Sequence, residues 1–107
     1  MRGASEEALR LRRLWNEQRG RPFPGGSASD PALNEIALYQ AWLGPIAEAA
    51  LARGGRLAPG HAQMLAARRA EASSGIWAAA GGLGGQAKEY VARLLAIEEL
   101  LAGLPTD

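Results

Sequence analysis

The sequence contains no cysteine, one histidine and one lysine. Without cysteine the chain cannot form disulfides, thiolate nucleophiles or cysteine metal sites. Its one histidine, His61, has no glutamate three residues before it, which excludes the paired Glu-x-x-His motifs of carboxylate-bridged di-metal bundles. The Gly-x-Ser-x-Gly turn of serine hydrolases and the phosphate-binding loop of nucleotide hydrolases are also absent. We therefore expect a protein that is not an enzyme and that binds no metal or cofactor.

Strand-forming residues and long apolar runs are scarce as well. Val91 and Thr106 are the only valine and threonine in the chain, so helices are the regular structure that the pattern supports. No segment approaches the ~20 consecutive apolar residues of a membrane-spanning helix. The N-terminal stretch "MRGASEEALRLRRLW" lacks the apolar region of an export signal. We expect a soluble, cytoplasmic protein that does not associate with membranes.

The length and charge of the chain limit the remaining classes. A length of 107 residues is typical of one domain. The net charge of +1 provides no overall field that would attract nucleic acid or anionic lipid, so any basic function must be local. Arginine provides eleven of the twelve basic residues, alongside many alanines and glycines, which is typical of a GC-rich bacterial genome.

Apolar periodicity and helix end signals predict four helices. Ser5 can cap the first helix, while Asp30 can cap the second, which has Pro31 at its first position. Glycine-rich and proline-rich stretches separate the helices. The predicted helices span residues 5–19, 31–53, 59–80 and 86–101. Four helices with short connections predict an all-α, antiparallel four-helix bundle, which dimerisation could complete.

The second predicted helix has two unusual features. Gly44 and Pro45 lie in its middle, and proline removes the backbone bond to Ala41, so we expect this helix to be kinked or split. Beyond the apolar face that we expect to enter the core, Leu38, Trp42 and Ala49 form a second stripe on nearly the opposite side. A helix with two apolar faces is typical of the centre of a bundle or of an interface between chains.

The last predicted helix carries the clearest packing pattern. Its apolar residues alternate at spacings of three and four, as in a packed helical seam. The seam consists of Ala87, Tyr90, Leu94, Ile97, Leu101 and Leu104. Glu98 lies near its edge, where a buried carboxylate would need an arginine partner or a raised pKa. We expect Glu98 to remain at the rim in solvent.

The surplus of apolar helix surface leads to the main functional hypothesis. A chain of this size has difficulty covering the second stripe of the second helix together with the leucines that flank the seam. We therefore expect a protein that works by association, either with itself or with another protein. The predicted interface consists of Leu38, Trp42, Ala49, Leu95 and Leu100.

A short basic stretch suggests a different partner. The residues Arg19-Gly20-Arg21-Pro22 resemble the core of the minor-groove DNA-binding hook, in which two arginines beside a glycine enter the narrow groove of A·T-rich DNA. The resemblance covers these four residues, and it implies binding to DNA, the less favoured partner. The residues that would contact DNA are Arg10, Arg13, Arg19 and Arg21.

The same stretch also has the features of a helix end. Arg19 suits the last turn of a helix, Gly20 can take the left-handed conformation after it, and Pro22 prevents continuation. In this interpretation Phe23 packs into the bundle. We favour the helix end over the hook, because the residues around the four-residue core carry no further positive charge.

Two further alternatives concern other residues. The second and third helices could form a helix-turn-helix that reads DNA with His61, Gln63, Arg68 and Arg69. The three tryptophans, Trp15, Trp42 and Trp77, could line a pocket for a small ligand, although one tryptophan per helix is also what a core requires.

Overall fold

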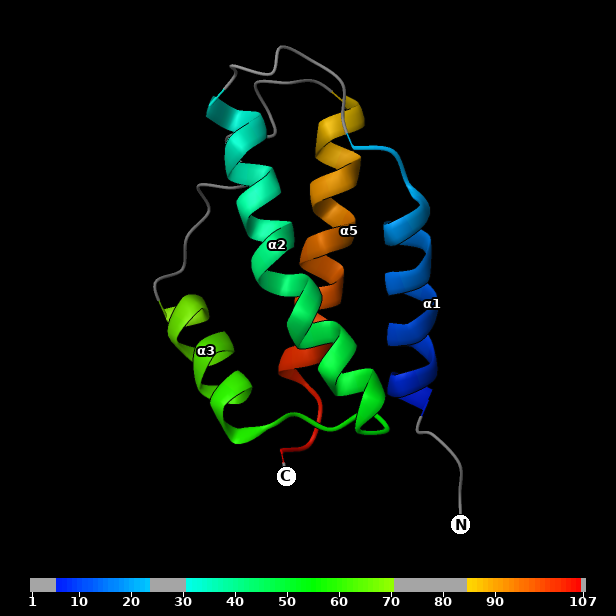
Figure 1. The fold of residues 1–107 in the computed structure, drawn as a ribbon, viewed down its shortest axis with the longest axis vertical. Helices are drawn as coiled ribbons and strands as arrows, with labels where there is room; N and C mark the ends of the chain where they lie inside the picture. Colours follow the sequence, from blue (N-terminus) through cyan, green and yellow to red (C-terminus); the bar gives the residue numbers. More distant parts are fainter. Residues whose placement is uncertain (1–5, 24–30, 71–84, 107) are drawn as a thin grey trace.

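The structure is a computed structural model that describes residues 6–23, 31–70 and 85–106. These residues form four helices, α1 (Glu6–Gly20), α2 (Pro31–Ala52), α3 (Pro59–Ala70) and α5 (Gly85–Ala102). The chain runs up α1, down α2, up α3 and down α5, so helices that follow one another are antiparallel (Figure 1). An isolated bridge between Leu57 and Thr106 is the only β pairing in the described ranges. The predicted all-α helical bundle is confirmed.

Helix α5 occupies the centre of the bundle, where it contacts α1, α2 and α3. All six residues of the predicted seam are buried, together with Val91 on the same helix. Each fully buried leucine or isoleucine side chain contributes about 1.5–3 kcal/mol relative to an exposed one. The seam pattern therefore identified the helix that organises the core.

Helix α2 is continuous through Pro45, so of the two expected outcomes at Gly44-Pro45 the split does not occur, and the kink stays a prediction. Proline removes only one backbone hydrogen bond, and Leu43 and Ile46 on either side are buried in the core and keep the two halves together. The helix ends near the predicted position, where Gly54 and Gly55 have φ angles of 72° and 93°. These left-handed residues allow Gly55 N–H to donate to the Ala50 carbonyl at 2.8 Å.

The end of α1 differs from the prediction in two respects. Gly20 belongs to the last turn of the helix, and its φ is not left-handed. The chain leaves the helix through a further turn, in which Arg21 N–H donates to the Gln18 carbonyl at 3.2 Å. Phe23 is 41% exposed and does not enter the core. It packs edge-on against the ring of the buried Tyr90, with centroids 5.4 Å apart.

Parts of the sequence prediction lie outside the described residues. Helix α3 begins at Pro59 as predicted, whereas its predicted extension beyond residue 70 and Trp77 lie outside the described residues. The proposed capping residues Ser5 and Asp30 are outside as well. Within the described part, Leu65 attaches α3 to the core, and Leu57 N–H donates to the Pro105 carbonyl at 2.9 Å just before α3 begins.

Candidate functional site

Helix α2 presents an exposed apolar side opposite its buried side. Its core residues, such as Ile36, Leu43 and Ala50, are buried. At 100° per residue, the positions around Ala41 point in the opposite direction. Six residues in this direction are all exposed, and we call them the outer strip: Asn34, Ala37, Leu38, Ala41, Pro45 and Glu48. The Leu38 side chain, with 60% of its residue surface exposed, is the largest apolar group of the strip.

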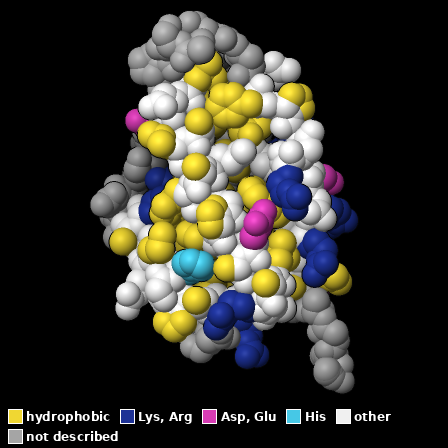
Figure 2. Space-filling view, viewed as in Figure 1, with side chains coloured by type: hydrophobic (Ala, Val, Ile, Leu, Met, Phe, Trp, Pro, Cys, Tyr) yellow, Lys and Arg dark blue, Asp and Glu magenta, His cyan; other side chains and the backbone are white. Residues whose placement is uncertain are grey.

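The composition of the outer strip differs from that of an ordinary solvated helix face. On α1 the exposed positions include seven charged residues: Glu6, Glu7, Arg10, Arg12, Arg13, Glu17 and Arg19. The outer strip contains only Glu48 as an ionisable residue. In the space-filling view hydrophobic side chains lie over α2, while arginine side chains gather at the right edge over α1 (Figure 2). An exposed face with a single ionisable residue among six is typical of an interaction surface.

The outer strip borders a hollow of about 390 Å³ between α1 and α2. Trp15 and Phe23 line one side of it, and Ala37, Ala41 and Pro45 of the strip line the other. The Trp15 indole N–H donates to Glu48 Oε2 at 3.3 Å. This bond fixes the Glu48 carboxylate within the outer strip and leaves Oε1 able to accept a further hydrogen bond.

A buried polar cluster lies on the other flank of α2 and joins three helices. Glu98 of α5 is only 4% exposed, so the expectation that it stays in solvent was wrong. Its Oε1 accepts a hydrogen bond from the Tyr39 hydroxyl of α2 and another from Arg68 Nε of α3 at 3.1 Å. Arg68 thus supplies the arginine partner that a buried Glu98 requires.

Aromatic rings complete this cluster. The Arg68 guanidinium carbon lies 4.4 Å from the centre of the Tyr39 ring and 5.8 Å from that of Trp42. The Tyr39 and Trp42 rings are stacked, with centroids 6.3 Å apart and an 18° angle between their planes. Arg68 is therefore engaged inside the bundle, and the helix-turn-helix hypothesis loses one of its base-reading residues.

The pKa of Tyr39 predicts a loss of stability at alkaline pH. Burial raises this pKa well above the ordinary value of about 10, and the adjacent Glu98 raises it further, although Arg68 partly opposes them. Above about pH 10 the unfolded chain ionises this tyrosine while the folded protein keeps it neutral, so the free energy of unfolding falls as pH rises. We expect a slope of up to about 1.4 kcal/mol per pH unit from this proton.

Urea unfolding at a series of alkaline pH values measures this slope. Tyr39→Phe should remove part of it, and Tyr90→Phe is the comparison, because burial also raises the pKa of Tyr90. An unchanged slope in Tyr39→Phe would show that Tyr39 ionises alike in the folded and unfolded states.

A second buried polar group lies between α1, α2 and α5. The Gln18 side chain is fully buried, and its amide nitrogen lies 3.5 Å from both the Tyr90 carbonyl and Gln40 Oε1. The Tyr90 hydroxyl also donates to Gln40 Oε1. The sequence prediction did not include this network, because glutamine residues on a helix pattern are normally assigned to solvent.

The residues of the predicted interface have different environments. Leu38 is exposed and belongs to the outer strip, whereas Trp42, Ala49, Leu95 and Leu100 are partly buried. Trp42, Leu95 and Leu100 pack against the core. Ala37, Ala41 and Pro45 were not among the predicted interface residues, although their spacing of four residues places them on one side of the helix.

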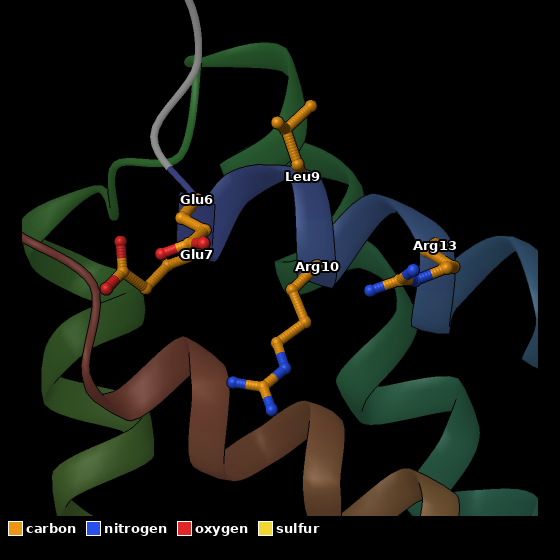
Figure 3. A pocket seen from close by; sticks show the side chains of 5 residues that line it. All are labelled: Glu6, Glu7, Leu9, Arg10 and Arg13. Carbon is orange, nitrogen blue, oxygen red and sulfur yellow. The ribbon is translucent and has the colours of Figure 1, made fainter.

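The predicted DNA-contacting arginines do not form a hook. Arg19 lies within α1, whereas the Arg21 side chain is partly buried with Nη1 3.9 Å from Glu89 Oε1 of α5. Arg10 and Arg13 are exposed on α1, where they line a surface hollow together with Leu9 and two acidic residues, Glu6 and Glu7 (Figure 3). The two carboxylates offset the positive charge of the two arginines.

Other kinds of site find no support in the residues described. Within these ranges no three His, Cys, Asp or Glu side chains are grouped so that they could hold a metal ion. No helix in the described part of the chain has the length and apolar character needed to cross a membrane. Comparisons with protein-family models, with curated proteins and with solved structures found no match to this chain.

Proposed function

We propose that this protein works by association, as a homodimer that buries the outer strip of α2. The observation that carries this proposal is the exposure of five uncharged residues and one carboxylate along a helix whose opposite side forms the core. Removing Leu38 and its apolar neighbours from water stabilises a dimer. The surrounding charged residues of α1 would form the polar rim that interfaces usually have.

A second copy of the chain suits this surface better than a strongly charged partner. Glu48 is the only charge on the strip, so there is little to attract an acidic or basic molecule. Small side chains at Ala37 and Ala41 let another helix approach closely. In a two-fold dimer each copy contributes the same patch, so both outer strips are covered together.

The polar cluster supports a structural role more than catalysis. Tyr39 and Arg68 both donate to the same oxygen of Glu98, so these groups satisfy one another. Each bond also joins α5 to a different helix. We therefore propose that the protein is not an enzyme.

DNA binding is the less supported alternative. Arg21 lies within ion-pair distance of Glu89, and the arginines of α1 lie among glutamates. If DNA were the partner, duplex binding would weaken steeply with salt. That binding would also be lost on joint Arg19→Ala and Arg21→Ala substitution.

The oligomeric state tests the proposed dimer. By analytical ultracentrifugation at high micromolar concentration, we expect a mass twice the 11.2 kDa of the chain. Ala41→Arg should yield the monomer mass, because the two-fold axis would bring the new charges together. Arginine is a good helix former, so circular dichroism should remain unchanged.

Ala92→Arg is the matched control, since Ala92 is also exposed on a helix but lies on α5. This variant should dimerise like the unsubstituted chain. A monomeric unsubstituted protein, or an Ala41→Arg variant that still dimerises, would contradict the proposal.

A further inference from the structure

We infer that the two α2 helices of the dimer pack antiparallel about Ala41, with Asn34 of each copy opposite Glu48 of the other. This inference rests on the proposed homodimer and adds its geometry. It predicts which residues meet across the two-fold axis, and therefore has a test separate from the oligomeric state.

The positions along α2 support this register. Asn34, Ala41 and Glu48 are seven residues apart, which is nearly two helical turns, so they lie along almost one line with a drift of about 20° per step. In an antiparallel two-fold pair, a residue before the axis meets the residue equally far beyond it in the second copy. With Ala41 at the axis, residue 34 meets residue 48.

The polar groups at the two ends of the outer strip are complementary in this arrangement. The Asn34 amide has two N–H donors, and Glu48 has Oε1 available because its bond to the Trp15 indole uses Oε2. The Trp15 bond also fixes the carboxylate before association, which lowers the entropy cost of the contact. An antiparallel dimer therefore forms two equivalent amide–carboxylate contacts.

A parallel pair would be less favourable. With the helices running the same way, each residue near the line meets its own copy, so Glu48 would face Glu48 across a partly dehydrated interface. Like charges in this position repel. The single carboxylate of the strip thus selects the antiparallel direction.

The apolar residues also fit the antiparallel register. The small side chain of Ala41 at the axis permits a short distance between the helices. Leu38 and Pro45 lie on the same side of the strip, three residues before and four residues after the axis. The exposed leucine of each copy therefore lies within one residue of the level of the proline of the other.

Cysteine cross-linking tests the register, because the native chain contains no cysteine. The two variants Asn34→Cys and Glu48→Cys are oxidised separately and as an equimolar mixture, one of them carrying an affinity tag so that masses differ. We expect disulfide-linked dimers only in the mixture. Residues 34 and 48 of different copies would be close, whereas identical residues would lie about 21 Å apart along the helices, beyond disulfide reach.

Charge substitution at Asn34 provides a readout without cross-linking. Asn34→Lys should strengthen dimerisation about tenfold, because the lysine meets Glu48, and Asn34→Glu should weaken it about tenfold. Asn16→Lys and Asn16→Glu, on the exposed face of α1, should leave the dissociation constant nearly unchanged.

The outcomes separate the register from the dimer itself. Cross-linking of each variant with itself would overturn the antiparallel direction. A dimer that dissociates on Ala41→Arg but shows no 34–48 cross-link would overturn the register and retain the proposed function. A monomeric unsubstituted chain would overturn both.

Discussion

Replacement of Glu98 by alanine is expected to lower the free energy of unfolding by about 3 kcal/mol. The change removes the oxygen that accepts hydrogen bonds from both Tyr39 and Arg68. It leaves the Arg68 cation beside a core with no anionic partner, and breaking a buried pair in this way usually costs 3–5 kcal/mol. The Arg68 side chain is 22% exposed, so water partly compensates and the lower end of that range applies.

Chemical unfolding at one fixed protein concentration measures this effect, since a dimer makes apparent stability depend on concentration. Glu98→Gln should cost less, because the amide oxygen can still accept from Tyr39 and Arg68. Glu89→Ala is the control on the same helix. Its contact with Arg21 is 3.9 Å long and the Glu89 side chain is 63% exposed, so its loss should cost less than about 1 kcal/mol. Equal losses in Glu98→Ala and Glu89→Ala would show that the buried cluster does not stabilise the fold.

Gly44→Leu is expected to have a comparable effect through a different cause. A Cβ atom at Gly44 would lie 3.0 Å from Cη2 and 3.3 Å from Cζ2 of the Trp15 ring. A leucine side chain cannot fit unless the ring moves, and the Trp15 residue is buried and bonded to Glu48. Overpacking of this kind costs 1–3 kcal/mol, and loss of the indole bond adds about 1 kcal/mol.

Gly60→Leu is the matched control for this substitution. Gly60 is also helical, and apart from its chain neighbours and the backbone of its own helix no atom lies within 4 Å of the position that its Cβ would occupy. Leucine has the higher helix propensity, so this control should be neutral or more stable by up to about 1 kcal/mol. Loss of stability in Gly44→Leu alone, accompanied by a red shift of tryptophan fluorescence, would locate the effect at Trp15. Equal stability of the two variants would contradict tight packing of α1 on α2.

Much of the fold could be predicted from the sequence because it depends on local patterns. The six-residue seam, which begins at Ala87 in α5 and ends at Leu104 just after that helix, was identified from its spacing, and all six residues are buried. The start of α2 at Pro31 and its end before Gly54 follow from residues that favour those conformations. The choice between a kink and a split at Pro45 was left open by the sequence, because it depends on whether packing on both sides holds the helix together.

The candidate site was only partly predictable. The sequence indicated that α2 has apolar residues on more than one side, and Leu38 is indeed exposed. Trp42 was assigned to the same stripe, but Arg68 of α3 lies over its ring at 5.8 Å. Such a contact between distant residues has no signature in the α2 sequence. The exposed face is consequently centred on Ala41, about 100° around the helix from Trp42.

The sequence by itself determined where helices α2 and α3 begin, where α2 ends and which side of α5 is apolar, because these features depend on residues within a few positions of one another. Only the tertiary structure decided that Glu98 is buried with Arg68 and Tyr39, and that Ala37, Ala41 and Pro45 remain in water. The reason is that exposure depends on which neighbouring helices cover each side. Helix α1 covers one flank of α2 and Arg68 of α3 lies over the other, which leaves the outer strip open between them.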